Sequence, residues 1–481
     1  TSITDAYLKT IYYTWDNDLN RTGIKDPENN ETTFTYDGMG NMLTIIRKKD
    51  SVFYTTTYTY NPIYNKLETI TDAKSRLTTE FGYDTANGNL LTITNKIPGG
   101  TDYVTTFAYD SYGQLEIKTD AKSHITRYTY YNNGLLHEEK REKDPSTIYT
   151  TTYVYDINGN PLTVTDAENH TTTYTYNALN QLLELKDANN HSTYYTYDRN
   201  SILKTIRDAK NHLTTYNYDL VDRLYNITYE YNEQINYTYD KMGNLKTKTD
   251  QNNDTTTYDY DDIYRLNTKT YQDTSTITYA YYDDGTLKDV TDSNGTTHHD
   301  YDEWNELEQV TYPGSIIISY DYDELGNRTS MTYPSGKIVS YTYDIMNRMK
   351  TITLEGATPK VATYTWNELS QRDLLELPNG AKVDYAYDTL NRLEALINKT
   401  SAELTIAAFT YTHDNIGNRK TMTDSEGLHN YTYDPAYQLT DVYYPARSDQ
   451  HYVYDPAGNR ETVAEGGAPT SYTANNANRY T

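Results

Sequence analysis

Four histidines recur in one short motif and are the first candidates for chemistry. His170, His191 and His212 each follow Asp-Ala-x-Asn at intervals of 21 residues, and His124 takes the equivalent place in an earlier copy. If successive copies stack, the imidazoles could form a ladder of metal ligands. The alternative, which we favour, is a solvated turn residue in each copy, because no neighbouring residues would hold the rings in place around a metal.

Aspartates recur at the same interval in two series: Asp166, Asp187 and Asp208 in one, and Asp198, Asp219 and Asp240 in the other. Carboxylates held close together could bind Ca²⁺, which would also offset repulsion between like charges. The competing interpretation is that each carboxylate accepts backbone N–H bonds within its own turn. We favour the turn role, since the sequence contains no EF-hand loop.

Tyrosines occur in pairs two residues apart, as in Tyr174/Tyr176, Tyr216/Tyr218 and Tyr237/Tyr239. We expect such rings to stack as cross-strand ladders, each contact contributing roughly 0.2–1 kcal/mol. The alternative is an aromatic surface that binds sugars or peptides. Asn-x-Thr triplets, including Asn226-Ile227-Thr228 and Asn236-Tyr237-Thr238, matter only if the protein is secreted by a cell that glycosylates.

Catalytic motifs are absent from the sequence, which has no G-x-S-x-G, H-E-x-x-H or P-loop pattern. A residue repeated in every copy is a poor catalytic candidate, because catalysis needs one asymmetric constellation. We therefore predict no enzyme activity, no catalytic or cofactor-binding residues and no metal site.

The elements that position these residues are copies of one unit. An aromatic residue followed by Asp or Asn recurs about 21 times, mostly 21 residues apart, from Trp15-Asp16 to Tyr454-Asp455. Within a copy, T-T-Y-T-Y alternates with period two, which predicts a strand with Thr on one face and Tyr on the other. A turn, a second strand such as Asn244–Asp250 and a second polar turn (DAKN, DANN, DSNG or PSGK) complete the copy.

The first turn has a fixed position for Gly or Asn, three residues after the Asp. Eleven copies follow this rule: Gly40, Gly113, Gly159, Asn180, Gly243, Asn305, Gly326, Asn347, Asn391, Gly417 and Gly458. Gly and Asn tolerate positive φ, so the position predicts the left-handed residue of a short hairpin loop.

Three copies are longer than the rest. The extra residues are NKIPGG, an extension between Asp388 and Asp414, and HEEKREKDPS (His137–Ser146); all fall at the second turn, where we expect loop insertions. No linker or composition break indicates a domain boundary, so we predict a single array over residues 1–481. Both ends, including the final YTANNANRYT, lie inside repeats, and we expect a piece of a longer chain.

The composition favours a thin, hydrated fold. Hydrophobic residues make up 36%, and that figure includes 57 Tyr against 5 Phe. Tyr hydroxyls need water or a partner, which limits the dry volume. The net charge of -26 argues against nucleic-acid binding. The sequence has no Cys for a disulfide framework and no apolar run long enough for a membrane span.

These observations predict an all-β fold. About 40 strands spaced ~4.8 Å apart would form a strip roughly 190 Å long. Because every strand pair adds about 20° of twist, a strip of that length must curl. We expect about 20 tandem hairpins in one antiparallel sheet that coils into a spiral hollow shell or tube.

The phrases YDGMGNM, YDKMGNL, YDELGNR and YDPAGNR, with the D-A-x-N/G turns between them, resemble the YD repeats of bacterial Rhs and WapA-like proteins, Tc toxin B and C components, and teneurins. The resemblance covers nearly the whole chain. It implies a secreted or cell-surface protein, with a bacterial source expected, whose β-strip forms a hollow container, tube or scaffold; in the family such a shell often encloses a C-terminal toxin. Self-assembly with other copies and an adhesin or fibre that binds glycans or cells through its Tyr-rich faces are the alternatives.

Overall fold

Nearly every segment of regular structure in the chain is a β-strand. The computed structural model describes residues 1–49 and 51–475, and within these residues the only helical segment is the 3₁₀ turn Glu230–Asn232. No helix in this part of the chain has the length and apolar character needed to cross a membrane. Of the final YTANNANRYT segment, residues 476–481 lie outside the described residues.

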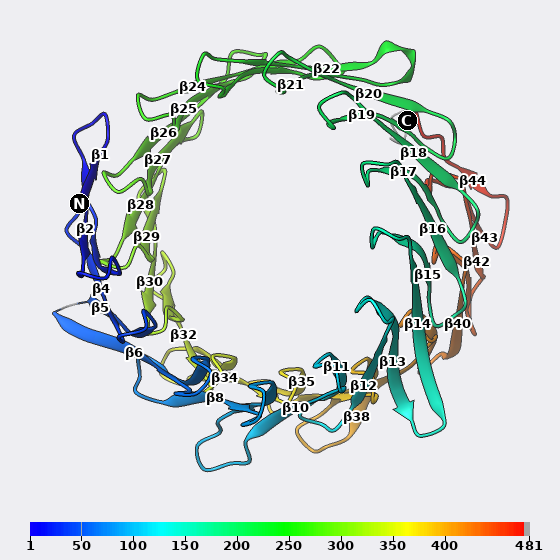
Figure 1. Cartoon of the computed structure of the whole chain (residues 1–481), viewed down its shortest axis with the longest axis horizontal. Helices are drawn as coiled ribbons and strands as arrows, with labels where there is room; N and C mark the ends of the chain where they lie inside the picture. Colours follow the sequence, from blue (N-terminus) through cyan, green and yellow to red (C-terminus); the bar gives the residue numbers. More distant parts are fainter. Residues whose placement is uncertain (50, 476–481) are drawn as a thin grey trace. The chain divides into compact units, whose positions relative to one another are not determined.

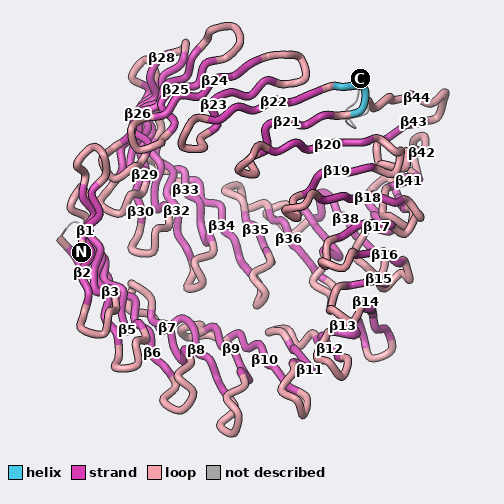
Figure 2. Tube along the Cα trace, turned by 45° about the horizontal axis from the view of Figure 1, so that its top comes forward, coloured by secondary structure: helices cyan, strands magenta, loops and turns pink. Residues whose placement is uncertain are grey.

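The first 22 strands alternate with short turns, as Figures 1 and 2 show. They are β1 Ser2–Thr4, β2 Thr10–Trp15, β3 Arg21–Lys25, β4 Glu31–Tyr36, β5 Met42–Lys49, β6 Val52–Tyr60, β7 Leu67–Thr71, β8 Leu77–Tyr83, β9 Leu90–Asn95, β10 Tyr103–Tyr109, β11 Leu115–Thr119, β12 Ile125–Tyr130, β13 Leu136–Asp144, β14 Thr147–Tyr155, β15 Pro161–Thr165, β16 Thr171–Tyr176, β17 Leu182–Lys186, β18 Ser192–Tyr197, β19 Leu203–Arg207, β20 Leu213–Tyr218, β21 Leu224–Thr228 and β22 Gln234–Tyr239.

The later strands continue the same alternation. They are β23 Leu245–Thr249, β24 Thr255–Tyr260, β25 Leu266–Thr270, β26 Thr276–Tyr281, β27 Leu287–Asp292, β28 Gly295–Tyr301, β29 Leu307–Tyr312, β30 Ile316–Tyr322, β31 Arg328–Thr332, β32 Ile338–Tyr343, β33 Met349–Leu354, β34 Lys360–Trp366, β35 Arg372–Glu376, β36 Lys382–Tyr387, β37 Leu393–Lys399, β38 Thr405–His413, β39 Arg419–Asp424, β40 Gly427–Tyr433, β41 Leu439–Tyr443, β42 Gln450–Tyr454, β43 Arg460–Glu465 and β44 Thr470–Ser471.

The strands form one 44-stranded sheet in which consecutive strands pair antiparallel, as β15, β16, β17 and β18 do. Thr and Tyr dominate these strands because β-branched and aromatic side chains suit a pleated, half-covered surface. The prediction of an all-β chain built as one long antiparallel sheet is confirmed.

By internal contacts the chain divides into two compact units, and each is described by itself. Unit 1 comprises Thr1–Phe107, Tyr239–Thr247 and Asp254–Pro378, and unit 2 comprises Ala108–Thr238, Lys248–Asn253 and Asn379–Thr481. The repeat pattern runs through both, and the single array over residues 1–481 stays a prediction.

A β-bulge recurs where the first strand of a copy meets its turn. In the β16–β17 pair, Tyr174 opposes Leu185 and Thr175 opposes Glu184, but Tyr176 opposes Leu182, so the register shifts at the final Tyr. The same shift occurs at Tyr36, Tyr197 and other copies. A type I turn followed by a left-handed residue creates such a bulge.

The sheet has a thin interior, as the composition predicted. No described side chain is less than 2% exposed, and the buried hydrophobic residues are few: Phe34, Tyr149, Ile235, Val310, Tyr341 and Val442. In β16 the face that carries Tyr174 and Tyr176 is half-buried, whereas Thr175 on the opposite face is exposed. Thr hydroxyls on that outer face bond across strands, for example Thr196 to Thr205 at 2.6 Å.

The expectation of loop insertions was wrong for two of the three long copies. Between Asp388 and Asp414 the extra residues lengthen β37 and β38 to seven and nine residues, and a five-residue turn, 400–404, joins them. The HEEKREKDPS segment extends the two strands of a hairpin instead, so β13 and β14 are each nine residues long and meet at a tight turn. NKIPGG does fall in an irregular segment, between β9 and β10. The KREKD stretch continues the backbone pairing between β13 and β14. Pairing two strands satisfies more backbone N–H and C=O groups than an open loop does.

Candidate functional site: the turns and the seams between rows

The first turn of each copy, which we call the YD turn, is held together by its Asp. In the turn 37–41, Asp37 Oδ1 accepts the N–H groups of Met39 and Asn41 at 2.9 Å, and Oδ2 accepts the Asn41 amide at 2.8 Å. These bonds, the Asn41 side chain first and its backbone second, hold the pKa of Asp37 below its usual range. The prediction for the Gly/Asn position is confirmed in all eleven copies, from Gly40 at φ 85° to Gly458 at φ 86°.

The second turn of each copy, which we call the DA turn, uses the same chemistry. Asp208 Oδ1 accepts the N–H groups of Lys210 at 2.9 Å and His212 at 2.8 Å, and Asn211 takes φ 71°. The other predicted carboxylates also bond the backbone of their own turns: Asp166, Asp187, Asp198, Asp219 and Asp240. The Asp ladders therefore have the turn role.

The four histidines are placed separately. His124, His191 and His212 each lie beside the Asp of their own turn, with Nδ1 to Oδ2 distances of 3.0, 3.6 and 3.2 Å. His170 instead contacts the Tyr437 hydroxyl at 3.0 Å. In the part of the chain that the structure describes, no group of three or more His, Asp or Glu is arranged to hold a metal ion.

In many copies the tyrosine of the YD turn bonds the preceding copy through its hydroxyl. Tyr36 donates to the Arg21 carbonyl at 2.9 Å, Tyr197 to the Leu182 carbonyl at 3.0 Å and Tyr260 to the Leu245 carbonyl at 2.9 Å. Trp366 makes the same link through its indole N–H, to the Met349 carbonyl at 2.7 Å. The sequence reasoning missed this bond, although an offset that is most often 15 residues between the YD tyrosine and the start of a strand is visible in the sequence.

Ring stacking is less uniform than the predicted cross-strand ladders. Tyr153 and Tyr155, two residues apart on β14, stack at 6.5 Å between ring centroids, whereas Tyr131 and Tyr155 on different hairpins meet edge-on at 6.2 Å. Burial raises the pKa of Tyr176 and Tyr218, consistent with half-covered rings.

The two predicted Asn-x-Thr triplets differ in access. Asn226 is buried, and its amide donates to the Asn236 side chain at 2.8 Å. Asn236 itself is exposed.

DA turns in the earlier part of each unit contact YD turns about 250 residues later, and we call each such line of contacts a seam. In unit 1, the Lys74 ammonium lies 2.7 Å from the Asp323 carboxylate. In unit 2, Lys210 lies 2.8 Å from Asp455, and the Asn189 amide donates to Asp434 at 2.8 Å. Figure 1 draws the two stretches of unit 1 in blue and in yellow-green. Sequence periodicity alone did not identify these partners.

The seam carboxylates are well covered. The Asp455 side chain is 2% exposed and the Asp323 side chain 8% exposed. Burial alone would raise the pKa of Asp323, but the Lys74 ammonium and backbone N–H groups outweigh it and lower the pKa. In Asp455 the same balance, with Lys210 as the main opposing group, also lowers the pKa. Removing one partner from such a pair leaves an uncompensated charge, which costs about 3–5 kcal/mol.

Aromatic residues complete both seams. In unit 1, the Trp304 indole N–H donates to the Lys48 carbonyl at 2.8 Å, and the Arg47 guanidinium lies 4.2 Å from the indole ring centroid. In unit 2, Tyr437 takes the left-handed position of its YD turn at φ 65°, and its hydroxyl donates to Asp166. Burial and Asp166 together raise the pKa of Tyr437.

Comparison with known folds gives one consistent answer. A Tc holotoxin pore from Photorhabdus luminescens superimposes with a TM-score of 0.69 at 14% identity, over 100% of this chain and 34% of that chain. Two crystal structures, of TcdB2-TccC3-TEV and TcdB2-TccC3, give TM-scores of 0.60 and 0.59 at 12% and 13% identity, over 100% of this chain and 37% and 36% of theirs. At these identities the likeness shows the fold, and the chain spans about a third of the length of those chains. No curated protein matches the sequence.

Two family models match parts of the sequence. Residues 254–416 match the teneurin YD-shell, and residues 155–192 match the RHS repeat. Both matched segments consist of the YD and DA turns described above. Residues 254–416 are thus similar to the YD-shell family and residues 155–192 to the RHS repeat, in agreement with the resemblance that the sequence indicated.

Proposed function

We propose that this chain is a structural segment of a shell: a β-strip whose successive windings are joined along seams to make the wall of a container or scaffold. The observation that carries the proposal is the seam contact, repeated in both units with the same polarity, DA turn to YD turn. Lys74–Asp323 and Lys210–Asp455 are separated by 249 and 245 residues. A strip that meets itself at a constant interval is suited to building a wall, and the absence of catalytic motifs from the sequence agrees with a role without enzymatic chemistry.

Electron microscopy of the purified chain tests the wall directly. We expect a hollow particle with a thin wall, in which a central cross-section shows low density. A filled particle would contradict the proposal, and so would a flexible ribbon with no contact between distant copies.

We further propose that the complete protein is extracellular or presented at a cell surface, as expected for a bacterial YD-repeat protein, and that its shell encloses a C-terminal toxin. The likeness to toxin complexes supports this. Reading the coding sequence beyond Thr481 tests it: an unrelated, Tyr-poor segment is expected, and a long run of further YD copies would instead favour a fibre.

The second candidate is an extracellular adhesin that binds glycans through exposed tyrosines. Tyr112 and Tyr264 at the tips of YD turns are 88% and 51% exposed, and these side chains favour it. A glycan array probed with the labelled chain separates the two candidates, because a shell wall alone predicts no selective glycan binding.

A further inference from the structure

Two hollows between consecutive YD turns form a matched pair within the chain. The first, of about 380 Å³, lies between turns 110–114 and 131–135 in unit 2. The second, of about 340 Å³, lies between turns 261–265 and 282–286 in unit 1. Four residues that line the first correspond to residues 151 positions later that line the second, as Gln114 does to Arg265 and Tyr130 to Tyr281. Position by position, the two hollows can therefore be compared.

At the second hollow, another part of unit 1, the DA turn Asp5–Lys9, lies against both YD turns, and Asp5, Tyr7 and Lys9 form one wall of the remaining space. The Tyr7 hydroxyl accepts the Asp262 N–H at 3.1 Å, and the Arg265 guanidinium lies 5.7 Å from the centroid of the Tyr7 ring. Lys9 pairs with Asp283. This occupant is thus recognised by one backbone donor, one cation over its ring and one carboxylate.

The first hollow lies between two turns in the same way as the second but lacks its charged side chains. Gln114 stands in place of Arg265, and it bridges to the next turn by donating to the Gly134 carbonyl at 3.2 Å, as Arg265 does to the Tyr282 carbonyl. Asn132 and Asn133 stand in place of Asp283 and Asp284, and both are exposed. A lysine-bearing turn would find no carboxylate here, because Asp110 is engaged by the N–H groups of its own turn.

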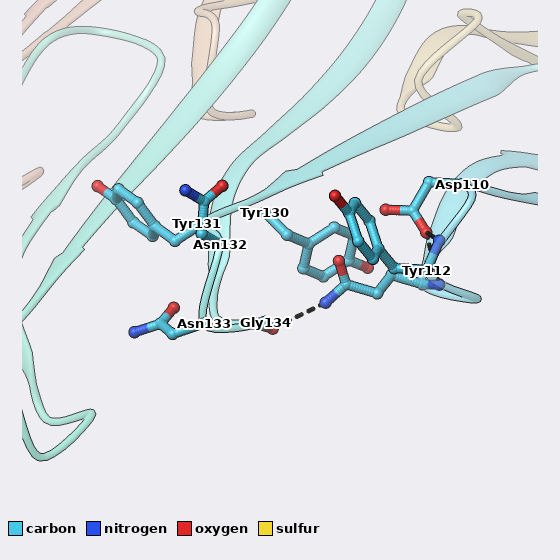
Figure 3. Close-up of a pocket in the computed structure, with 8 residues that line it drawn as sticks. Asp110, Tyr112, Tyr130, Tyr131, Asn132, Asn133 and Gly134 are labelled. Carbon is cyan, nitrogen blue, oxygen red and sulfur yellow. Dashed lines mark hydrogen bonds between the residues drawn. The ribbon is translucent and has the colours of Figure 1, made fainter.

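The aromatic walls of the first hollow are rigid on one side and open on the other. The Tyr130 hydroxyl donates to the Leu115 carbonyl and the Tyr131 hydroxyl to the Tyr153 carbonyl, both at 2.9 Å. Tyr112, where the second hollow has Ile263, adds a third ring and is 88% exposed. Figure 3 shows Tyr112 beside Tyr130, with Asn132 and Asn133 on the far side.

We infer that this hollow is a binding site for a neutral saccharide. Pre-positioned aromatic rings offer flat apolar faces to the C–H face of a pyranose, and amide groups supply both donors and acceptors for hydroxyls. The Asn133 Oδ1 accepts the Leu135 N–H at 3.2 Å, so Asn133 offers its NH₂ group as a donor, and the exposed Asn132 offers a second amide. Fixed aromatics combined with exposed Asn side chains suit polar ligands. The volume lies within the range of small-ligand pockets, about 300–1,000 Å³. The first hollow has aromatic rings and amide groups, whereas the second has charged side chains at the matching positions. A neutral ligand with many hydroxyl groups therefore fits the first hollow. The inference does not depend on the shell function; it rests on the second candidate, the glycan-binding adhesin, and names one site for it.

Titration of the full chain with chitotriose, cellotriose and maltotriose, followed by saturation-transfer NMR, tests the site. We expect at least one of them to saturate, with transfer to its C–H protons. Tyr112→Ala should weaken that binding at least about tenfold. The double substitution Asn132→Asp and Asn133→Asp, which restores the charges of the occupied hollow, should weaken it as well.

Leu179→Ala is the matched control, because Leu179 holds the same turn position as Tyr112 and is 70% exposed. It should leave binding unchanged. The inference is overturned if no saccharide saturates, or if Leu179→Ala reduces binding as much as Tyr112→Ala. Tighter binding of a cyclic peptide with the Asp5–Lys9 sequence than of any saccharide would also overturn it, since the site would then be a docking place for a further protein turn.

Discussion

The YD turns of each unit fall into two groups with the same internal structure and different surroundings. In unit 1, the turn 37–41 is open to solvent, and Met39 at its tip is 71% exposed. The turn 302–306 lies in the seam, and Trp304 at the same position is half-buried. Unit 2 repeats the contrast with exposed Leu179 and half-buried Leu390. Turn chemistry therefore makes the hairpin, and the tip residue decides what the hairpin can join.

The difference between open turns and seam turns is also visible in the sequence, at the tip position, which is two residues after the first residue of the turn. Seam turns carry almost only apolar residues there: Ile263, Trp304, Leu325, Met346, Leu390, Ile416, Ala436 and Ala457, with Asp284 as the exception. Open turns are mixed, with Asn133, Asn158 and Asn200 among them. Apolar side chains are favoured at the covered tip positions, because an apolar side chain stabilises the fold only where it is removed from water.

The largest expected effect comes from breaking a seam ion pair. Lys210→Met leaves the Asp455 carboxylate buried without its cation, and we expect the free energy of unfolding to fall by about 3–5 kcal/mol. Urea denaturation followed by circular dichroism measures the change. Lys241→Met, in an open YD turn, is the control and should change stability by less than about 0.5 kcal/mol. Equal effects of the two substitutions would show that the seam contributes nothing.

Next in size is the loss of an apolar tip. Trp304→Ala removes the bond to the Lys48 carbonyl and the stack under Arg47. Because the ring is half-buried, we expect a loss of about 2–3 kcal/mol, below the ~3–5 kcal/mol of a fully buried aromatic. The same urea titration on Met39→Ala, at the equivalent open tip, should show a loss below about 0.5 kcal/mol. A larger loss for Met39→Ala would break the distinction between open and seam turns.

Replacing the glycine at the left-handed turn position should lower stability by the same amount in open turns and in seam turns. Gly40 in an open turn and Gly285 in a seam turn have φ of 85° and 94°, and a Cβ at either would meet no backbone within 4 Å. Each Gly→Ala change should therefore cost about 1–2 kcal/mol through the backbone alone. Thermal unfolding monitors it, with Gly38→Ala, which has no positive φ and open space, as the neutral control. A much greater cost at Gly285 than at Gly40 would mean that the seam also constrains the turn backbone.

The smallest expected effect is a change in stability that occurs only at acid pH. Folding lowers the pKa of Asp455 from its ordinary value of 3.8, so its contribution is present above that value and is lost as the pH falls through the lower, folded pKa. Stability measured from pH 7 to pH 3 should fall less steeply in the double variant Lys210→Met/Asp455→Asn than in the natural chain. An identical slope would show that this carboxylate does not contribute to acid unfolding.

Much of the fold could be predicted from the sequence because it is local. A period-two alternation of Thr and Tyr specifies a strand, and an Asp or Asn followed three residues later by Gly40 or Asn180 specifies its turn. The phenolic bond from Tyr197 to Leu182 was not predicted, since it joins two copies through a backbone carbonyl that no side-chain pattern marks.

The partners that meet in the seams could not be predicted from the sequence of a single copy. Every copy carries similar turns, so nothing within one copy indicates that Lys74 meets Asp323 and not another Asp. That choice depends on how much each strand pair twists, summed over many copies, and a small error per copy would select a different partner. The HEEKREKDPS segment failed for a related reason: its charged residues indicate exposure, which an extended hairpin provides as well as a loop does.

The backward reach of the YD tyrosine has a consequence for how such an array changes in length. Since the hydroxyl bonds of Tyr36 and Tyr197 go to the unit just before, duplication or deletion of an entire unit in the gene leaves such phenols with a carbonyl to bond. The separation of donor and acceptor ranges from 14 residues for Tyr433 to 18 for Tyr60, so a pair of strands also absorbs small changes of length. Whole-unit steps can therefore lengthen the array without requiring any new kind of contact.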